Sequence, residues 1–354
     1  MDMKRSYYRD LRLFDTWPLG LWLVACAAAL ALVPFFAGNY LMYVLGYIAI
    51  NAMVALGLNV LVGYTGQISL GHAGFFAIGA YATVLLAKAG LPIPLALLAA
   101  ACIAGAFGFL LGLPALRLEG PYLAVITLGF GLTVENIFAK AAIFGGANGP
   151  PVPAFNLSLW PGFSREQNLY WLILLCTGAT LFAIRNLMRT RVGRAFVAIR
   201  DSDVAAACAG VDLTWFKTLA FAVSAFFTGA AGGLFAFHLG QVDPTTFNLM
   251  LSILFLAMVV IGGVGSILGP LLGAITISLL NLKLKGLKLA DFEQIPLAGK
   301  EVAGFIARNF METGMANIQF IVYGGILVLI MIFEPLGLYG LWIRAKRYWR
   351  TWPL

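Results

Sequence analysis

The sequence contains little charge. Only 11% of its 354 residues are Asp, Glu, Lys or Arg, whereas 61% are hydrophobic. Soluble domains contain about 25% charged and about 45–50% apolar residues. A water-soluble chain of this length could not cover its surface with so few charged side chains. The composition therefore predicts an integral membrane protein, although length alone would suggest two soluble domains.

Residues that bind metals or perform acid–base chemistry are also scarce. The two histidines and four cysteines do not fall at metal-ligand spacing, so we interpret the cysteines as small apolar helix residues. The patterns G-x-x-x-x-G-K-[ST], G-x-S-x-G and H-E-x-x-H are absent. The chain therefore cannot hold ATP phosphates in the P-loop manner, and we expect no catalytic residue, metal or cofactor in it.

Long apolar segments dominate the rest of the chain. A helix needs about 20 apolar residues to cross the hydrocarbon layer. Gly, Asn and Pro interrupt several segments, and such breaks are tolerated where protein or a water-filled cavity satisfies the freed backbone groups. We predict an all-α, polytopic membrane helix bundle at 18–340 with about ten spans, some interrupted: 18–37, 40–62, 68–88, 91–113, 121–143, 168–187, 216–239, 248–263, 266–282 and 318–334.

Positive charge predicts the orientation. It gathers before the first span, in the loop after the sixth and in the C-terminal tail, which should therefore lie on the cytoplasmic side. We expect a cytoplasmic segment at 1–17 followed by an uncleaved first helix, and a basic cytoplasmic tail at 341–354. A chain whose N- and C-termini both lie in the cytoplasm must cross the membrane an even number of times, and ten spans meet this condition. The mixed-charge stretch 283–316 would then lie outside, and its amphipathic part suggests an interfacial position.

Polar residues interrupt the apolar pattern at 63–76. Tyr64, Gln67, Ser69 and His72 lie between two apolar helices. Polar groups in lipid are costly unless they face a bundle interior or a pathway. One interpretation is a half-broken helix that lines a translocation pathway, and the other is hydrogen bonding that holds helices together. Both interpretations stay open for Gln67 and Ser69, whereas for His72 we slightly favour a role in holding helices together.

Two further features concern the interior of the bundle. The pattern G-x-x-G-x-I occurs at 63–68 and again at 262–267, which suggests two related halves, although glycine is common enough for chance to explain it. Glu135 lies in an apolar run with Lys140 five residues later. It is either a pathway residue or part of an ion pair near a helix end, and we favour the ion pair because a charge at the membrane centre is costly.

The arginine-rich loop 188–213 has helical periodicity. Val192, Phe196 and Ile199 fall on one helix face, and Gly210 is a suitable stop. We predict one or two short cytoplasmic helices with one apolar face. Such a helix could rest on lipid headgroups or dock into another protein. Its mixture of Arg200 with Asp201 favours a protein partner, because membrane-resting helices usually carry Lys and Arg on their polar face.

These stretches together resemble a known family. GYTGQISLGHAGF (63–75), LRLEGPYLA (116–124), GRAFVAIRD (193–201), GGVGSILGP (262–270) and EPLGL (334–338) occur in the order found in the branched-chain amino acid permeases of bacterial ABC importers. The second and third runs are similar to those of the M-type membrane subunit. The resemblance covers about residues 40–340. It departs from the pattern at Asp201, where the family commonly has Glu, and in the long stretch 283–316.

The resemblance implies a permease subunit in the bacterial inner membrane that contacts lipid and binds no nucleic acid. It would form the pathway with a second, homologous permease, two cytoplasmic ATPases would use the ATP, and a periplasmic binding protein would deliver a hydrophobic amino acid. The coupling helix that enters the ATPase would comprise Gly193, Arg194, Ala198, Ile199, Arg200, Asp201 and Gly210.

Three alternatives stay open at this point. The same family includes importers of urea, amides and aromatic acids. An ion-coupled secondary carrier would need an intramembrane ionisable residue, for which Glu135 is the candidate. A membrane enzyme would need clustered histidines or carboxylates at one interface, and the sequence contains no such cluster.

Overall fold

The computed structural model describes residues 17–36, 38–115, 120–155, 162, 164–286, 324–325, 328–329, 332–334 and 336–351. Its elements are helices, and within the described residues the β pairing is limited to an isolated bridge between Pro151 and Gln241. Over this part of the chain, the α-helices are α2 (Trp17–Phe36), α3 (Asn39–Asn59), α4 (His72–Lys88), α5 (Ile93–Ala115), α6 (Pro121–Lys140), α7 (Arg165–Arg189), α8 (Arg191–Asp201), α9 (Asp203–Cys208), α10 (Leu213–Leu239), α11 (Leu249–Gly262), α12 (Leu268–Gly286) and α16 (Gly337–Thr351).

Short helical turns continue or join these helices. The π-helix η1 (Val60–Tyr64) extends α3 without a break, and the 3-10 turns η2 (Ala142–Phe144), η3 (Gly146–Asn148) and η4 (Pro244–Phe247) occur in the connections. π-Turns inside α-helices occur frequently at functional sites. The position of η1 therefore makes the end of α3 a candidate functional region.

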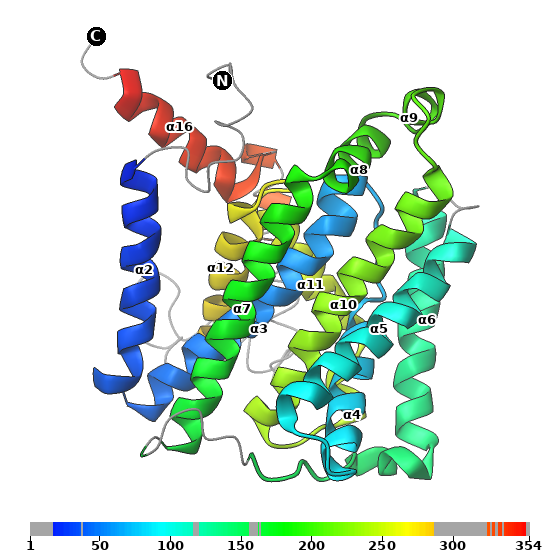
Figure 1. Cartoon of the computed structure of the whole chain (residues 1–354), viewed down its shortest axis with the longest axis vertical. Helices are drawn as coiled ribbons and strands as arrows, with labels where there is room; N and C mark the ends of the chain where they lie inside the picture. Colours follow the sequence, from blue (N-terminus) through cyan, green and yellow to red (C-terminus); the bar gives the residue numbers. More distant parts are fainter. Residues whose placement is uncertain are drawn as a thin grey trace, which may run out of the picture.

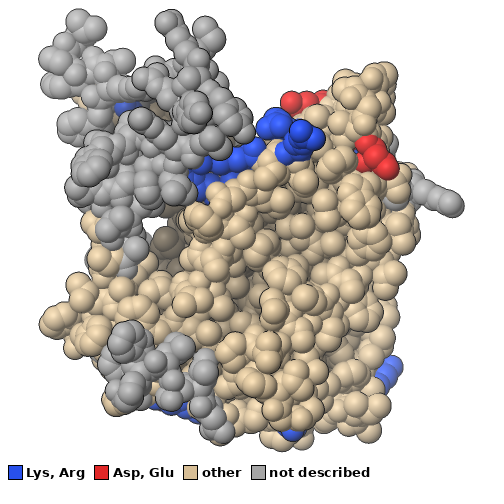
Figure 2. All heavy atoms as spheres, in the orientation of Figure 1, with Lys and Arg blue, Asp and Glu red and all other residues tan. Residues whose placement is uncertain are grey.

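Among the described residues, five helices are long and apolar enough to cross a membrane: α3 with η1, α5, α6, α7 and α10. Three further apolar helices, α4, α11 and α12, are shorter over their described residues. On the face drawn in Figure 2, the charged side chains that are visible lie near the two ends of the molecule, and a broad band between them shows none. This distribution fits a bundle whose middle lies in the hydrocarbon layer.

The helices differ greatly in burial. In the most apolar part of the spans, 83% of α3 with η1 and 67% of α10 lie inside the protein, compared with 22% for α6 and for α7. Helix α10 packs against α3, α4 and α5, and α11 and α12 pack against each other and against α3. Helix α6 lies at the edge of the bundle (Figure 1). The core therefore forms around α3 and α10, and α6 presents most of its surface outward.

A close approach of α4 to α10 depends on small residues. A Cβ atom added at Gly79 would collide with the backbone of Gly229, and one added at Gly232 would collide with the Phe76 carbonyl. In membranes, where lipid tails are as apolar as side chains, helices associate largely through such packing. Buried aromatic rings fill the space around this contact, including Phe76 on Phe235 with ring centroids 5.0 Å apart.

The helix ranges confirm most of the sequence prediction. Each predicted span from 18–37 to 266–282 coincides with a helix to within a few residues at most ends. The predicted span 318–334 and the stretch 283–316 lie largely outside the described residues, as does the segment 1–17. The described part of the basic tail at 341–351 belongs to α16.

Candidate functional site

Helices α8 and α9 form the predicted short helices after the arginine-rich region. They lie at one end of the bundle, beside the start of α10 (Figure 1). Ser202 separates them in an extended conformation, and its hydroxyl accepts a hydrogen bond from the Ala205 amide. A 2.5 Å ion pair between Lys217 and Asp203 joins α9 to α10. The pair of helices is therefore fastened to a membrane-spanning helix.

The apolar face of α8 packs against its own chain. Phe196 and Ile199 are 0% and 3% exposed. Phe196 belongs to a buried cluster that includes Leu56, Ile184 and Phe221 from α3, α7 and α10. The prediction of one apolar face is confirmed, but neither lipid nor another protein covers it. What α8 presents outward is its other face, where Arg194 and Asp201 are exposed and Ala198 is half-buried. Arg200 is exposed in part, but its guanidinium group is directed elsewhere.

Glycine at 193 allows α8 to fold tightly back on α7. A Cβ atom at Gly193 would collide with the backbone of Met188 in the last turn of α7. At the other end, the turn after α9 finishes at Gly210, whose φ of +83° lies in the left-handed region. The predicted glycines therefore mark the two ends of the α8–α9 unit.

Arg200 turns inward from the end of α8. Its Nη1 atom donates a 2.6 Å hydrogen bond to the carbonyl oxygen of Gly63 in η1. The last carbonyls of a helix have no partner within the helix. In η1 they are satisfied from outside, since Leu61 O accepts from the Gln67 amide at 3.1 Å and from the Thr65 hydroxyl at 2.6 Å. Arg200 thus completes the end of an interrupted span.

The second interrupted segment meets the first at the same place. Asn59, which is 1% exposed, accepts a hydrogen bond from the Gly265 amide at 3.0 Å and donates one to the Ser266 carbonyl at 2.8 Å. Gly265 has φ +76°, and a Cβ atom there would collide with Nη1 of Arg200. We call Asn59, Gly63, Arg200, Gly265 and Ser266 the junction.

The junction brings together the two G-x-x-G-x-I stretches noted in the sequence. One follows α3 and the other connects α11 to α12. Whether the two halves share an origin stays a prediction. The two segments are joined regardless of their origin, because Arg200 bonds to the first segment and Asn59 of the first segment bonds to the second.

Beyond the junction, the chain from Gly66 to α4 is held by hydroxyl groups of other helices. The Leu70 amide donates to Thr127 Oγ1 on α6 at 2.9 Å, and the Ala73 amide donates to Ser252 Oγ on α11 at 2.9 Å. The freed backbone groups are therefore satisfied by protein, as expected for a break inside a membrane helix bundle.

His72 is enclosed at the start of α4. It is 0% exposed, its Nδ1 lies 3.0 Å from Ser69 Oγ, and its Nε2 lies 2.8 Å from Ser224 Oγ on α10. Both ring nitrogens are thus hydrogen-bonded to serines. This geometry favours the packing interpretation of His72.

The other candidate pathway residues are buried too. Gln67 is 7% exposed and donates to Thr65 Oγ1 at 3.0 Å, Ser69 is 0% exposed, and Tyr64 is 8% exposed in the cluster around Phe196. The structure brings Tyr64 next to α8 and Ser69 next to His72. Their assignment to the pathway stays a prediction.

The expected ion pair between Glu135 and Lys140 is wrong. Within the part of the chain that the structure describes, ion pairs join Lys217 to Asp203 and Arg344 to Glu334, and neither Glu135 nor Lys140 takes part in one. Five residues correspond to about 140° around an α-helix, so the two side chains leave α6 on different sides. Both groups are left without a charged partner from the described residues.

Sequence reasoning missed the partners that hold the 63–76 stretch. Thr127, Ser224 and Ser252 are isolated hydroxyl residues in apolar spans, and each is buried. Their presence in apolar spans could have indicated hydrogen bonds between helices, because an unpaired polar group in lipid is energetically unfavourable. Which of them pair could not be read from the sequence, since their partners lie 57, 152 and 179 residues away.

His238, at the end of α10, lies apart from the junction. It stacks on Tyr43 with ring centroids 4.4 Å apart, and its Nε2 is buried without a hydrogen-bond partner among the described residues. Over those same residues, no group of three or more His, Cys, Asp or Glu side chains could hold a metal ion.

Comparisons with known proteins agree with the motifs. The family model described as "Branched-chain amino acid transport system / permease component" matches residues 40–331. The chain is 35% identical over 343 residues to the high-affinity branched-chain amino acid transport system permease protein LivM of Escherichia coli, covering 90% of this chain and 74% of that protein. It is 36% identical to LivM of Salmonella typhimurium, covering 82% of this chain and 67% of that protein.

A more distant relative is also a branched-chain amino acid permease. The chain is 26% identical to the branched-chain amino acid permease protein BraD of Pseudomonas aeruginosa, covering 82% of this chain and 91% of that protein. No solved structure matches the chain significantly. The match over most of its length shows that the chain belongs to the branched-chain amino acid transport permease family, as a multi-pass membrane permease of a bacterial ABC transporter and not itself an enzyme.

Proposed function

We propose that this chain is the LivM-like subunit of an importer for branched-chain amino acids, and that α8 and α9 transmit the work of a separate ATPase to the bundle. The substrate assignment is supported by the similarity to LivM over 90% of the chain. The observation that carries the transmission is the hydrogen bond from Arg200 on α8 to the Gly63 carbonyl on the interrupted α3 span.

The proposed orientation places α8, α9 and α16 in the cytoplasm. Arg189, Arg191, Arg194 and Arg200 lie at this end, and Lys346 is exposed on α16. Cytoplasmic segments of membrane proteins are enriched in Lys and Arg. The positive charge of the two chain ends predicts that both lie on this side as well, for which ten spans remain the consistent count.

The ATPase would contact the outward face of the α8–α9 unit. Arg194 and Asp201 are exposed there and offer both signs of charge to a partner. Gly193 and Gly210 set its two ends, and the buried Phe196 and Ile199 make it move together with the bundle. A movement of the ATPase would then reach α3 and the α11–α12 connection through the junction.

The complete importer would contain a second, homologous permease, two cytoplasmic ATPases and a periplasmic binding protein. ATP is used by the ATPases, and this chain supplies half of the pathway wall. Alternating access then requires the two permeases to change their relative arrangement as the ATPases close and open.

Reconstitution tests this function directly. The complete importer is purified and inserted into lipid vesicles with ATP on the ATPase side and leucine-loaded binding protein on the other. We expect leucine uptake that requires ATP and the binding protein. Uptake driven by an ion gradient without ATP would instead support a secondary carrier, and uptake of urea, amides or aromatic acids but not leucine would overturn the substrate assignment.

A charge reversal tests the docking face. We expect Asp201→Lys combined with Arg194→Glu to reduce co-purification of the ATPases and to abolish stimulation of ATP hydrolysis by the loaded binding protein. Lys346→Gln is the control, because Lys346 is exposed at the same end but on α16. Normal assembly and stimulation in the double variant would refute the docking face.

A further inference from the structure

Helix α6 presents a continuous outward face. Its exposed residues recur at steps of three and four from Tyr122 to Lys140, which places them on one side of the helix. Gly129 lies on this face, and a Cβ atom there would meet nothing within 4 Å. Because only 22% of its apolar part is buried, α6 is available to something outside the described chain.

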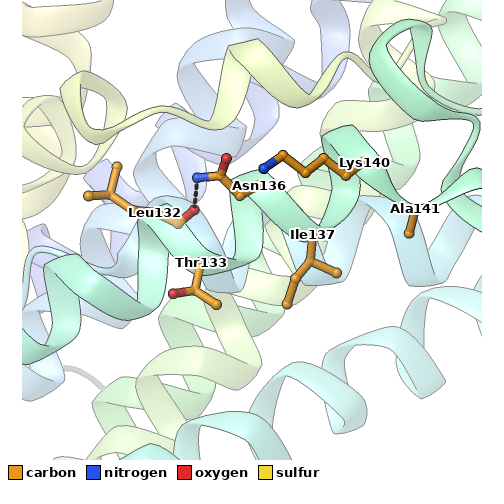
Figure 3. Close-up of a pocket in the computed structure, with 6 residues that line it drawn as sticks. All are labelled: Leu132, Thr133, Asn136, Ile137, Lys140 and Ala141. Atoms are coloured by element: carbon orange, nitrogen blue, oxygen red, sulfur yellow. Dashed lines mark hydrogen bonds between the residues drawn. The ribbon is translucent and has the colours of Figure 1, made fainter.

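The C-terminal half of this face forms a shallow, open groove, which is lined by residues of α6 and the adjoining Ala141 alone. Its lining combines apolar Leu132, Ile137 and Ala141 with polar Thr133, Asn136 and Lys140. Figure 3 shows the Lys140 side chain extending back along the helix toward Asn136.

A second lateral groove provides the contrast. It has about 480 Å³ and lies between α5, α7 and α10, where Cys102, Ala183, Leu187, Phe226 and their neighbours line it without a charged or amide side chain. Acyl chains can fill such a groove at no electrostatic cost. Lipid cannot satisfy the amide of Asn136 in the same way, since a polar group in hydrocarbon needs a partner. Of these two grooves, only the one on α6 offers amide and ammonium groups to a polar occupant.

The polar groups of the α6 groove have donors to spare. The Asn136 Nδ2 atom donates to the Leu132 carbonyl at 2.8 Å, which uses one of its two hydrogens. Lys140 takes part in no ion pair with a described residue. An ammonium group and an amide N–H four residues apart lie on the same side of a helix and suit a carboxylate, which accepts charge-assisted hydrogen bonds.

We propose that this face of α6 is the pathway wall contributed by this chain, and that Lys140 and Asn136 hold the carboxylate of the amino acid while its apolar side chain contacts Leu132 and Ile137. The inference rests on the proposed function. The C-terminal end of α6 lies at the end of the bundle away from α8 and α9 (Figure 1). With α8 in the cytoplasm, the site is at the periplasmic mouth, where the binding protein releases its ligand.

A charge-removal experiment tests the carboxylate contact. In vesicles containing the complete importer, we expect Lys140→Gln to lower leucine uptake per ATP hydrolysed about tenfold, and Lys140→Arg to retain most of it. Lys88→Gln is the matched control, since Lys88 is an exposed lysine in the last turn of α4, outside the groove. Unchanged uptake in Lys140→Gln would show a lysine that merely extends to the lipid headgroups and would overturn the site.

Thiol labelling tests the position of the face independently. With the four native cysteines replaced, Thr133→Cys and Asn136→Cys should react with a charged methanethiosulfonate reagent, and turnover with leucine-loaded binding protein should slow the reaction. Ala183→Cys, in the apolar groove, should not react. Unreactive cysteines on α6, or reaction that leucine does not slow, would refute the inference. Failure of the wild-type importer to take up leucine would instead refute the proposed function.

Discussion

The junction beneath α8 and the groove on α6 both contain polar side chains within apolar helices, but their surroundings are opposite. In the junction, Asn59 is 1% exposed and its amide makes two hydrogen bonds to the second interrupted segment. In the groove, Asn136 is exposed, and among the described residues its hydrogen-bond partner is the Leu132 carbonyl of its own helix. The same residue type therefore joins segments in one place and leaves a donor for a ligand in the other.

The contrast gives a way to separate structure from function in a membrane protein. Polar groups that are enclosed and paired within the chain hold an irregular backbone in place, and their loss should appear as lost stability. Polar groups that face outward without partners have a use outside the chain, and their loss should appear as lost transport. The following predictions test this separation in order of decreasing effect.

The largest effect is expected for a side chain forced into the junction. Gly265→Val places a β-branched residue at φ +76°, where its Cβ would collide with Arg200 Nη1 and lie 3.0 Å from the Gly63 carbonyl. We expect little folded protein and a loss of uptake greater than tenfold. The recovery of monodisperse protein and its thermal midpoint in detergent measure this. Gly178→Val on α7 is the control, since a Cβ there meets nothing within 4 Å.

Removal of the guanidinium should separate ATP hydrolysis from transport. Arg200→Gln loses the 2.6 Å bond to Gly63, so we expect the importer to assemble and hydrolyse ATP but to carry about tenfold less leucine per ATP. Arg200→Lys should restore part of the ratio, because an ammonium can also donate to a carbonyl. A normal ratio in Arg200→Gln would show that α8 acts on the bundle by another contact.

His72 tests the packing side of the comparison. In His72→Leu the hydroxyls of Ser69 and Ser224 lose their partner, at a cost of about 1–3 kcal/mol for each unsatisfied group. We expect a lower thermal midpoint, partly restored by adding Ser224→Ala, with uptake per folded molecule unchanged. Lost uptake without lost stability would favour the pathway interpretation of His72 instead.

The smallest effect is expected at the rim of the bundle. The Lys217–Asp203 pair joins α9 to α10 with side chains 13% and 32% exposed. Such partly exposed pairs contribute about 0.2–1 kcal/mol. Lys217→Met should therefore lower the thermal midpoint only slightly, and a double-mutant cycle with Asp203→Asn measures the pair. A loss as large as that of His72→Leu would show that the α8–α9 unit depends on this pair.

The sequence predicted the helices well because membrane helices are long and apolar. Helices α5, α7 and α10 follow uninterrupted apolar runs, and their ranges differ from the prediction by at most three residues at each end. The glycine-rich break after α3 was also visible in the sequence, whereas the boundary between α8 and α9 at Ser202 was not predicted. The spacing of charged residues was a less reliable guide. Glu135 and Lys140 were expected to form an ion pair, but residues five apart point to different sides of an α-helix.

The candidate site was predicted only in part. The α8–α9 unit was found from its periodicity, and its apolar face is present, but the sequence could not show that this face packs on α3, α7 and α10. Nor could it show that Arg200, expected on the docking surface, reaches inward to Gly63. The outward face of α6 was missed because helical periodicity alone does not say which side of a helix its neighbours cover.

The sequence by itself determined the membrane environment, the helical class, the breaks and the family, since these depend on composition, local propensity and short motifs. Tertiary structure alone decided which polar groups are paired and which are open. Asn59, His72 and Arg200 find partners more than 130 residues away, whereas Asn136 and Lys140 find none among the described residues outside their own helix. A polar side chain in lipid must be paired, and only the packing of distant helices determines whether the chain or a ligand supplies the partner.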